Sequence, residues 1–257
     1  MIEILAALTG LLEDRLWEFA KVFIRVSAVM AVLPAFGEQS VPIRVKLGAA
    51  LAFALIVTPA ISEGTVTPTA PLPAMLGSEV VVGLILGLLF RFFVFALQIA
   101  GSVAANVMSL SQLFGGGLGA EPQPAFSTLL VVAGLALATM LGLHVYVVQA
   151  LILSYELFPP GRFPNGADIS DWGIDQVARS FALGLSLAGP FVLASILYNL
   201  GLGVISRAMP QLMVAFVGAP AISMGGLVLL LIVSPFLLSL WVDLMLDGVD
   251  LRDGAFQ

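Results

Sequence analysis

Long apolar segments separated by short polar stretches fill most of this chain. They cover residues 16–36, 47–61, 74–108, 127–153, 177–205 and 228–246. A helix that crosses a membrane needs about 20 predominantly apolar residues, at a rise of about 1.5 Å per residue. The pattern predicts an all-α membrane protein of about six long hydrophobic, partly broken helices that pair as helical hairpins, in a single membrane domain over residues 1–257.

The segments differ in length and regularity. Residues 47–61 are short for a full span, whereas residues 74–108 are too long for one straight span. Residues 127–153 form the cleanest span. Residues 158–175 are the most polar region, and their proline, glycine and aspartate content predicts a loop.

Prolines interrupt the last two segments. Pro190 lies inside the fifth segment, Pro235 inside the sixth, and Pro220 between them. Proline removes a backbone donor and clashes with the preceding turn, so helices are expected to kink or break at these positions. Inside a membrane the freed carbonyls need other helices or water. We therefore expect a subunit that is buried among other helices.

The stretch NVMSLSQLFGGGLGAEPQPAF, residues 106–126, lies between two apolar segments but is a poor helix former. Each of its glycines costs about 1 kcal/mol in a helix interior. Pro122 and Pro124 then favour extended backbone before them. Irregular backbone at membrane depth is tolerated where protein buries it or where it lines a watery cavity. We interpret the stretch as one that closes a conduit; the alternative is a re-entrant packing element.

Composition supports a membrane protein with few charges. The chain is 60% hydrophobic and 10% charged, whereas soluble domains carry about 25% charged residues. The net charge of −6 argues against a nucleic-acid partner, which requires a basic face. The absence of cysteine excludes disulfides, thiolate metal sites and cysteine nucleophiles.

Several ionisable residues lie inside the apolar segments. Glu18, Lys21 and Arg25 share one helical face. For Glu18 and Lys21 an interfacial cluster and a protein contact both stay open, whereas Arg25 lies deeper and is expected to meet a carboxylate. Glu79 and Arg91 lie in the third segment, twelve residues apart. Such intramembrane charges face protein or water rather than lipid.

The third segment also carries small and polar positions. Gly83 and Gly87 form a small-xxx-small pair, which lets another helix approach closely. Gln98, Asn106 and Gln112 add polar groups toward the glycine-rich stretch. They suit a surface that faces water or polar partners.

Candidate chemistry is sparse. The chain has no P-loop, HExxH or GxSxG motif, and GGGLG lacks the strand–turn–helix context of a dinucleotide fingerprint. Asp243, Asp247 and Asp250 could hold a cation, but a solvated acidic face is favoured because no acidic residue completes an EF-hand-like loop. We expect no enzymatic activity, no cofactor and no metal site.

Four blocks together resemble the FliR family, flagellar biosynthesis proteins of the bacterial type III export gate with homologues in virulence secretion systems. The blocks are RVSAVMAVLPAFGEQSVPIRVKLGAALAFALIVTP, AGSVAANVMSLSQLFGGGLGAEPQPAFSTLL, GLHVYVVQALILSYELFPPG and GLGVISRAMPQLMVAFVGAP. They occur in the family's order, and RAMPQ is the most specific. Glu121–Pro122 stands where the family has an aspartate–proline pair, a departure from the family's pattern in this loop.

The resemblance implies an export-gate subunit in the bacterial inner membrane, at the flagellar basal body. It would join FliP-like and FliQ-like subunits in a helical hetero-oligomer, with FlhB-like and FlhA-like export components nearby, in contact with membrane lipid. Unfolded protein substrates would cross the pore. The loop that matches the family's plug is residues 109–126. Gating is expected from Leu113, Phe114, Gly115, Gly116, Gly117, Gly119, Glu121 and Pro122, and subunit assembly from Arg207, Pro210 and Gln211.

The alternative function is a self-contained secondary transporter, because broken helices with polar groups at the midplane are typical of that class. Against it, the first and last three segments show no convincing repeat. An intramembrane enzyme is disfavoured because the chain lacks active-site pairs.

Overall fold

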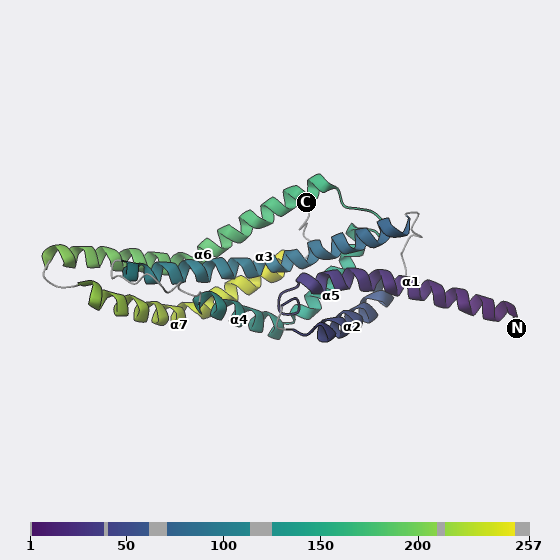
Figure 1. Ribbon diagram of the computed structural model, residues 1–257, viewed down its shortest axis with the longest axis horizontal. Coiled ribbons are helices and arrows are strands. Elements are labelled where there is room, and N and C mark those ends of the chain that lie inside the picture. The colour runs from purple at the N-terminus through teal and green to yellow at the C-terminus, as the bar shows by residue number, and fades with distance from the viewer. Residues whose placement is uncertain (1, 39–40, 62–70, 114–124, 210–213, 250–257) are drawn as a thin grey trace. The chain divides into compact units, whose positions relative to one another are not determined.

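Helices are the only regular elements in the part of the chain that the structure, a computed structural model, describes: residues 2–38, 41–61, 71–113, 125–209 and 214–249. In these ranges the element order is α1 (Ile2–Val32), α2 (Ile43–Ile61), α3 (Leu72–Leu113), α4 (Ala125–Met140), α5 (Leu143–Leu157), α6 (Gly166–Ala208) and α7 (Val214–Val249) (Figure 1). The expected all-α class is confirmed.

The chain forms two compact units. The first unit contains residues 1–91, 141–175 and 245–257, and the second contains residues 92–140 and 176–244. Helices α3, α6 and α7 each contribute to both units. Each unit therefore draws its core from segments far apart in the sequence.

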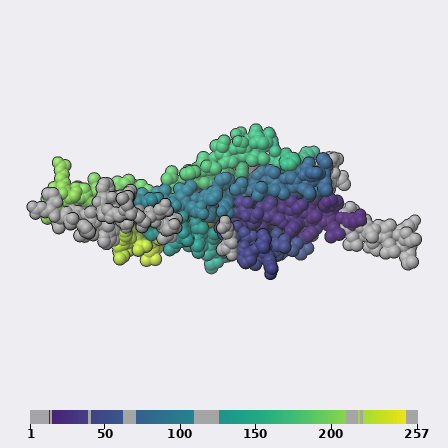
Figure 2. All heavy atoms as spheres, viewed as in Figure 1, coloured from purple at the N-terminus to yellow at the C-terminus, as the bar shows by residue number. Residues whose placement is uncertain are grey.

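In the first unit, α2 packs against α1 and α5; Figure 2 shows the surfaces of α1 and α2 side by side. The buried residues of α1 recur at helical spacing, as in Val22, Val26 and Val29, and form an apolar stripe that faces the core. Helix α3 approaches α1 closely. A Cβ at Gly83 would collide with the Arg25 carbonyl oxygen, and one at Gly87 would lie 3.0 Å from the Val29 carbonyl oxygen. The expected close approach at this glycine pair is confirmed.

In the second unit, α4, α6 and α7 surround the later turns of α3. The Trp241 indole on α7 donates a 2.8 Å hydrogen bond to the Phe93 carbonyl oxygen, and the Ser195 hydroxyl on α6 donates one of the same length to Val107. At Gly184 of α6, an added Cβ would lie 2.8 Å from the Ile99 side chain. The later turns of α3 are therefore the centre of this unit.

Four helical stretches in the described ranges are long and apolar enough to cross a membrane: α2, Leu72–Met108, α6 and Ala221–Val249. Helices α4 and α5 add a broken span, bent by 72°. Helix α1 does not qualify, so the span expected at residues 16–36 is not supported. Its residues 15–25 alone include four charged residues, Arg15, Glu18, Lys21 and Arg25, more than a lipid-facing helix readily accepts.

The segment expected as the cleanest span, residues 127–153, is not one helix. It breaks between Met140 and Leu143, where Gly142 has φ 92°, in the left-handed region. Glycine adopts this conformation without a Cβ clash. The break was missed because a single glycine in an apolar run is compatible with a continuous helix.

The breaks expected in the last two segments are absent. Helix α6 continues through Pro190, and α7 continues through Pro220 and Pro235. A proline removes one backbone hydrogen bond, but neighbouring helices can hold the helix together. Around Pro190, the side chains of Leu187, Ala188 and Phe191 are all buried against the protein, which keeps α6 continuous.

The loop expected at residues 158–175 is shorter, because α6 begins at Gly166. The Asn165 side-chain oxygen accepts a 3.2 Å hydrogen bond from the Ala167 backbone N–H, as an N-cap residue does. Asp168 lies in the first turn, where a negative charge is favourable. The asparagine cap and the acidic first turn outweigh the turn-forming composition.

Candidate functional site

The connection between α3 and α4, which contains the glycine-rich stretch, is shorter at both ends than the predicted loop. Helix α3 runs on to Leu113, and α4 starts at Ala125. Residues 109–113 and 125–126 are therefore helical, and the expectation that the loop spans residues 109–126 is wrong at both ends. Residues 106–113 contain neither glycine nor proline, so α3 continues up to the glycines. The other residues proposed for gating lie outside the described residues: Phe114, Gly115, Gly116, Gly117, Gly119, Glu121 and Pro122.

The two helices that flank this loop touch at a defined point. Gly101 of α3 lies against the backbone of Ser127 in the first turn of α4, so closely that an added Cβ would collide with the Ser127 Cα atom. The Ser127 hydroxyl donates a 3.2 Å hydrogen bond to the Gln98 carbonyl oxygen. This contact holds α4 against α3 close to the end of the loop.

The contact also fixes the distance that the loop must bridge. Leu113 is 12 residues beyond Gly101 on the same helix, which places it about 18 Å further along the axis. The connection from Leu113 to Ala125 can reach about 40 Å when extended. The chain between the two helices is therefore roughly twice as long as the gap requires.

A buried ion pair lies in the first unit. The Arg25 Nε atom on α1 donates a 2.7 Å hydrogen bond to Glu79 Oε2 on α3, and Arg25 Nη2 donates a 3.2 Å bond to Glu79 Oε1. Both side chains are at most 1% exposed. The two parallel bonds give the bidentate geometry that is strongest for an arginine–carboxylate pair. The expected carboxylate partner of Arg25 is therefore Glu79.

Helix α5 completes this cluster. Arg25 Nη1 donates a 2.9 Å bond to the Ser154 hydroxyl, and Nη2 donates a 2.9 Å bond to the Phe158 carbonyl oxygen just past the helix end. The Tyr155 hydroxyl donates to Glu79 Oε2 at 3.3 Å, and its ring lies 3.6 Å from the guanidinium carbon. The hydrogen bonds and the cation–π contact offset the cost of taking two charges out of water. The cluster thus joins α1, α3 and the end of α5.

Arg91, the third charge expected inside the membrane, has a different role. Its Nη1 atom donates a 3.2 Å bond to the carbonyl oxygen of Val32, the last residue of α1, and lies 3.9 Å from Glu38 Oε1. The last carbonyls of a helix lack partners within the helix and attract cations. Arg91 therefore caps the C-terminus of α1.

The proposed assembly residues are only partly described. Arg207 lies exposed in the last turn of α6, whereas Pro210 and Gln211 lie outside the described residues. Over residues 2–38, 41–61, 71–113, 125–209 and 214–249, no three His, Asp or Glu side chains gather as a metal-binding group.

The sequence reading missed the residues of α5 and α4 that complete these sites. Ser154 and Tyr155 touch Arg25 or Glu79 from 129 and 76 residues away in the chain. Ser127 contacts Gly101 across the glycine-rich loop. Many serines and all three tyrosines of the chain lie in or beside apolar segments, so no local pattern distinguishes Ser127, Ser154 or Tyr155. The only signal for this cluster in the sequence was the presence of two opposite charges, Arg25 and Glu79, inside apolar segments.

The chain is similar to known proteins along most of its length. The model of the family described as bacterial export proteins, family 1, matches residues 16–248. The chain is 32% identical to the flagellar biosynthetic protein FliR of Caulobacter vibrioides, over 90% of this chain and 94% of that protein. It is 26% identical to FliR of Escherichia coli K12, over 83% of each. It is also 25% identical to Yop proteins translocation protein T of Yersinia pestis, over 88% of each chain.

Proposed function

Because this chain belongs to family 1 of the bacterial export proteins, the family of FliR, we propose that it walls and gates an export pore. The family match makes it a membrane component of type III protein export. It would lie in the inner membrane at the flagellar basal body. Unfolded protein substrates would cross the membrane along it, and the α3–α4 loop would close the pore at rest.

The observation that carries this proposal is the contact between Gly101 and Ser127. The contact holds the helices on both sides of the loop while the connection between them has about 20 Å of length to spare. Four of the residues from 115 to 119 are glycine, and glycine tolerates large changes in φ and ψ. A loop with fixed ends and spare length can both cover an opening and move away from it.

Assembly with other membrane subunits is the second part of the proposal. Large apolar side chains are exposed along α6 and α7, including Leu197 at 70% and Leu231 at 77%. Exposed apolar surface of this kind faces lipid or another membrane protein. FliP-like and FliQ-like subunits would cover part of it in a helical hetero-oligomer, with FlhB-like and FlhA-like components beside it.

Deleting residues 115–119 is expected to make the assembled apparatus leak ions and small solutes. The shortened connection loses its glycines and about 17 Å of its reach, so it no longer covers the opening. The measurement is dye or ion uptake by cells that express the complete apparatus. Deleting residues 64–68, an equal number from another connection between helices, is the control and should leave permeability low. Low permeability after the first deletion, with normal recovery of the complex, would contradict the role of the loop in closing the pore.

Replacing Arg207 with glutamine is expected to lower recovery of the complex on native gels severalfold. In the part of the chain that the structure describes, Arg207 forms no ion pair, so its charge is available to a neighbouring subunit. Arg179→Gln, an exposed arginine on the same helix, is the matched control and should recover normally. If Arg207 only favours the C-terminal end of α6, worth about 0.3–1 kcal/mol, both variants will assemble equally.

A further inference from the structure

Arg91 lies near the middle of an apolar helical stretch. The stretch Leu72–Met108 of α3 is apolar enough to cross a membrane, and Arg91 follows its first residue by 19 positions and precedes its last by 17. Its pair with Glu38 has side chains that are 30% and 45% exposed. By contrast, the side chains of the Arg25–Glu79 pair are at most 1% exposed. Charges that their own chain does not enclose face water or other protein, because lipid does not solvate them.

The ends of two helices lie beside this ion pair. Arg91 donates to the carbonyl oxygen of Val32 at the end of α1. Lys46, in the first turn of α2, donates a 3.0 Å hydrogen bond from Nζ to the Gly37 carbonyl oxygen. Arg44 in the same turn is exposed. Charged side chains of both signs and the backbone of two helix ends are therefore concentrated around the middle of α3.

The break between α4 and α5 adds backbone groups without partners. Gly142 is the N-cap of α5, and no side chain caps this helix end. The Gly142 carbonyl oxygen accepts from the N–H groups of Val145 and Tyr146. Among the described residues, no acceptor meets the N–H groups of Leu143 and His144, and the exposed His144 side chain forms no hydrogen bond. Hydrocarbon offers no hydrogen bonds to such groups.

The break and the exposed ion pair lie at similar distances from the buried cluster. Leu143 precedes Tyr155, which contacts Glu79, by 12 residues, and Arg91 follows Glu79 by 12 residues. Each separation is about 18 Å along a helix. The connection that follows α5 packs on α3 at Gly77, before Glu79, so α5 itself extends from the cluster in the direction of Arg91.

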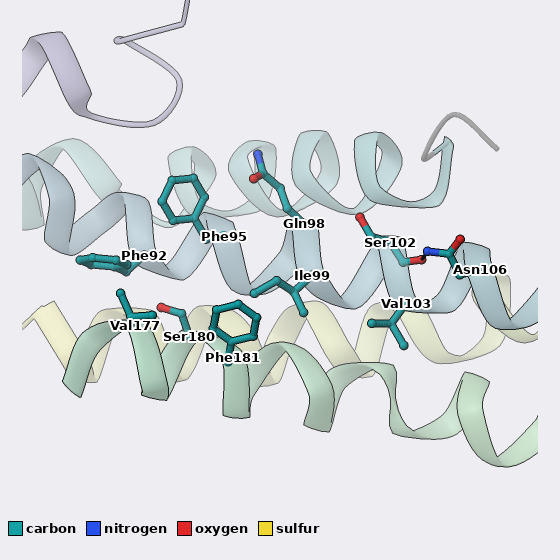
Figure 3. Close-up of a pocket in the computed structure, with 10 residues that line it drawn as sticks. All are labelled: Phe92, Phe95, Gln98, Ile99, Ser102, Val103, Asn106, Val177, Ser180 and Phe181. Carbon is teal, nitrogen blue, oxygen red and sulfur yellow. Dashed lines mark hydrogen bonds between the residues drawn. The ribbon is translucent and has the colours of Figure 1, made fainter. Parts of the chain in front are cut away.

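A groove in the second unit has a different lining. Its volume is about 510 Å³, and ten residues line it beside α6 (Figure 3): Phe92, Phe95, Gln98, Ile99, Ser102, Val103, Asn106, Val177, Ser180 and Phe181. None of these ten is charged. The Asn106 amide donates a 2.8 Å hydrogen bond to the Ser102 carbonyl oxygen, and the Ser180 hydroxyl donates a 2.7 Å bond to the Gln176 carbonyl oxygen. The groove therefore gives no comparable reason for water.

We propose that, in the assembled apparatus, water reaches the Arg91 region, which consists of Glu38, Arg91 and the break at residues 142–144. Water can donate to the carboxylate and accept from the guanidinium and the backbone N–H groups, whereas a lipid chain can do neither. A neighbouring subunit would have to supply donors and acceptors together. The inference goes beyond the proposed function, because it requires neither a pore nor a loop that closes it.

Cysteine labelling tests this inference, because the chain contains no cysteine. Glu38→Cys and His144→Cys place single thiols in the Arg91 region, and Leu55→Cys places one at an apolar residue of α2 that is 65% exposed. A charged maleimide that does not cross lipid is applied to both faces of membranes that contain the complete apparatus. Because maleimides react with thiolates formed in water, we expect labelling at positions 38 and 144 at least tenfold faster than at position 55.

Labelling after denaturation in detergent is the control that all three thiols are present. Rates at positions 38 and 144 no higher than at position 55 would overturn the inference, since lipid or another subunit would then cover the region. If Glu38→Cys does not assemble, His144→Cys decides the outcome, because its side chain forms no hydrogen bond among the described residues.

A matched pair of charge removals gives a second test on the purified chain. A hydrated ion pair contributes little to stability, so Glu38→Gln is expected to lower the thermal unfolding midpoint by at most about 4 °C. Glu79→Gln removes the charge of the buried pair and should lower the midpoint by clearly more. Equal, large decreases would show that the Glu38 pair is shielded from water, which would overturn the inference.

Export distinguishes this inference from the proposed function. The unmodified chain is tested for rescue of export in a strain that lacks it. Rescue together with slow labelling at positions 38 and 144 would remove only the inference about water. Fast labelling without rescue would support the inference and remove the proposed function.

Discussion

Replacing Glu79 with alanine is expected to destabilise the protein by about 3–5 kcal/mol, the cost of leaving a buried charge without its partner. Arg25 is 1% exposed and would keep only the Ser154 and Phe158 oxygens as acceptors. Neither carries a negative charge, so the guanidinium would lie uncompensated in the core. The measurement is the thermal unfolding midpoint of the purified chain in detergent, followed by tryptophan fluorescence.

A paired substitution separates the charge from the packing. Arg25→Met combined with Glu79→Leu removes both charges and keeps apolar volume, a change that is often neutral or stabilising for a buried ion pair. We therefore expect the double variant to unfold at a higher temperature than Glu79→Ala. A Glu79→Ala midpoint equal to that of the unmodified chain would mean that water or another group reaches Arg25, which would contradict the buried arrangement.

The second large effect is expected at Gly101, where α4 lies against α3. Gly101→Ala is expected to destabilise the protein by about 1–3 kcal/mol, the usual cost of overpacking. The new methyl group would collide with the backbone of Ser127, and backbone cannot rotate away as a side chain can. The shift of α4 would also move the C-terminal end of the glycine-rich loop, so we expect permeability of the assembled apparatus to change together with stability.

Gly201→Ala is the matched control in the second unit. Among the residues that the structure describes, and apart from its own turn of α6, nothing lies within 4 Å of a Cβ at Gly201, so the alanine should stabilise the helix by up to about 1 kcal/mol. The two glycine-to-alanine changes should therefore have opposite signs in the same thermal assay. A stabilising effect at Gly101 would contradict the close contact between α3 and α4.

Much of the secondary structure could be predicted from the sequence because membrane helices need long apolar runs. The third segment, the close approach at Gly83 and Gly87, and a carboxylate partner for Arg25 were all predicted from local composition or from the cost of a buried charge. The predicted helix boundaries were wrong where a residue type occurs both at helix breaks and inside continuous helices. Gly142 breaks a run that appeared continuous, and Pro190 leaves α6 intact.

The sequence by itself determined that this protein is helical, membrane-embedded and poor in charge, because apolar length and the cost of charge in lipid are properties of local segments. Its family resemblance was also readable from ordered blocks of residues. Only the tertiary structure decided that Glu79 is the partner of Arg25, that Ser127 lies against Gly101, and that polar residues of α3 line a groove beside α6. The first two contacts join residues 54 and 26 positions apart. All three depend on how whole helices pack, which no local pattern specifies.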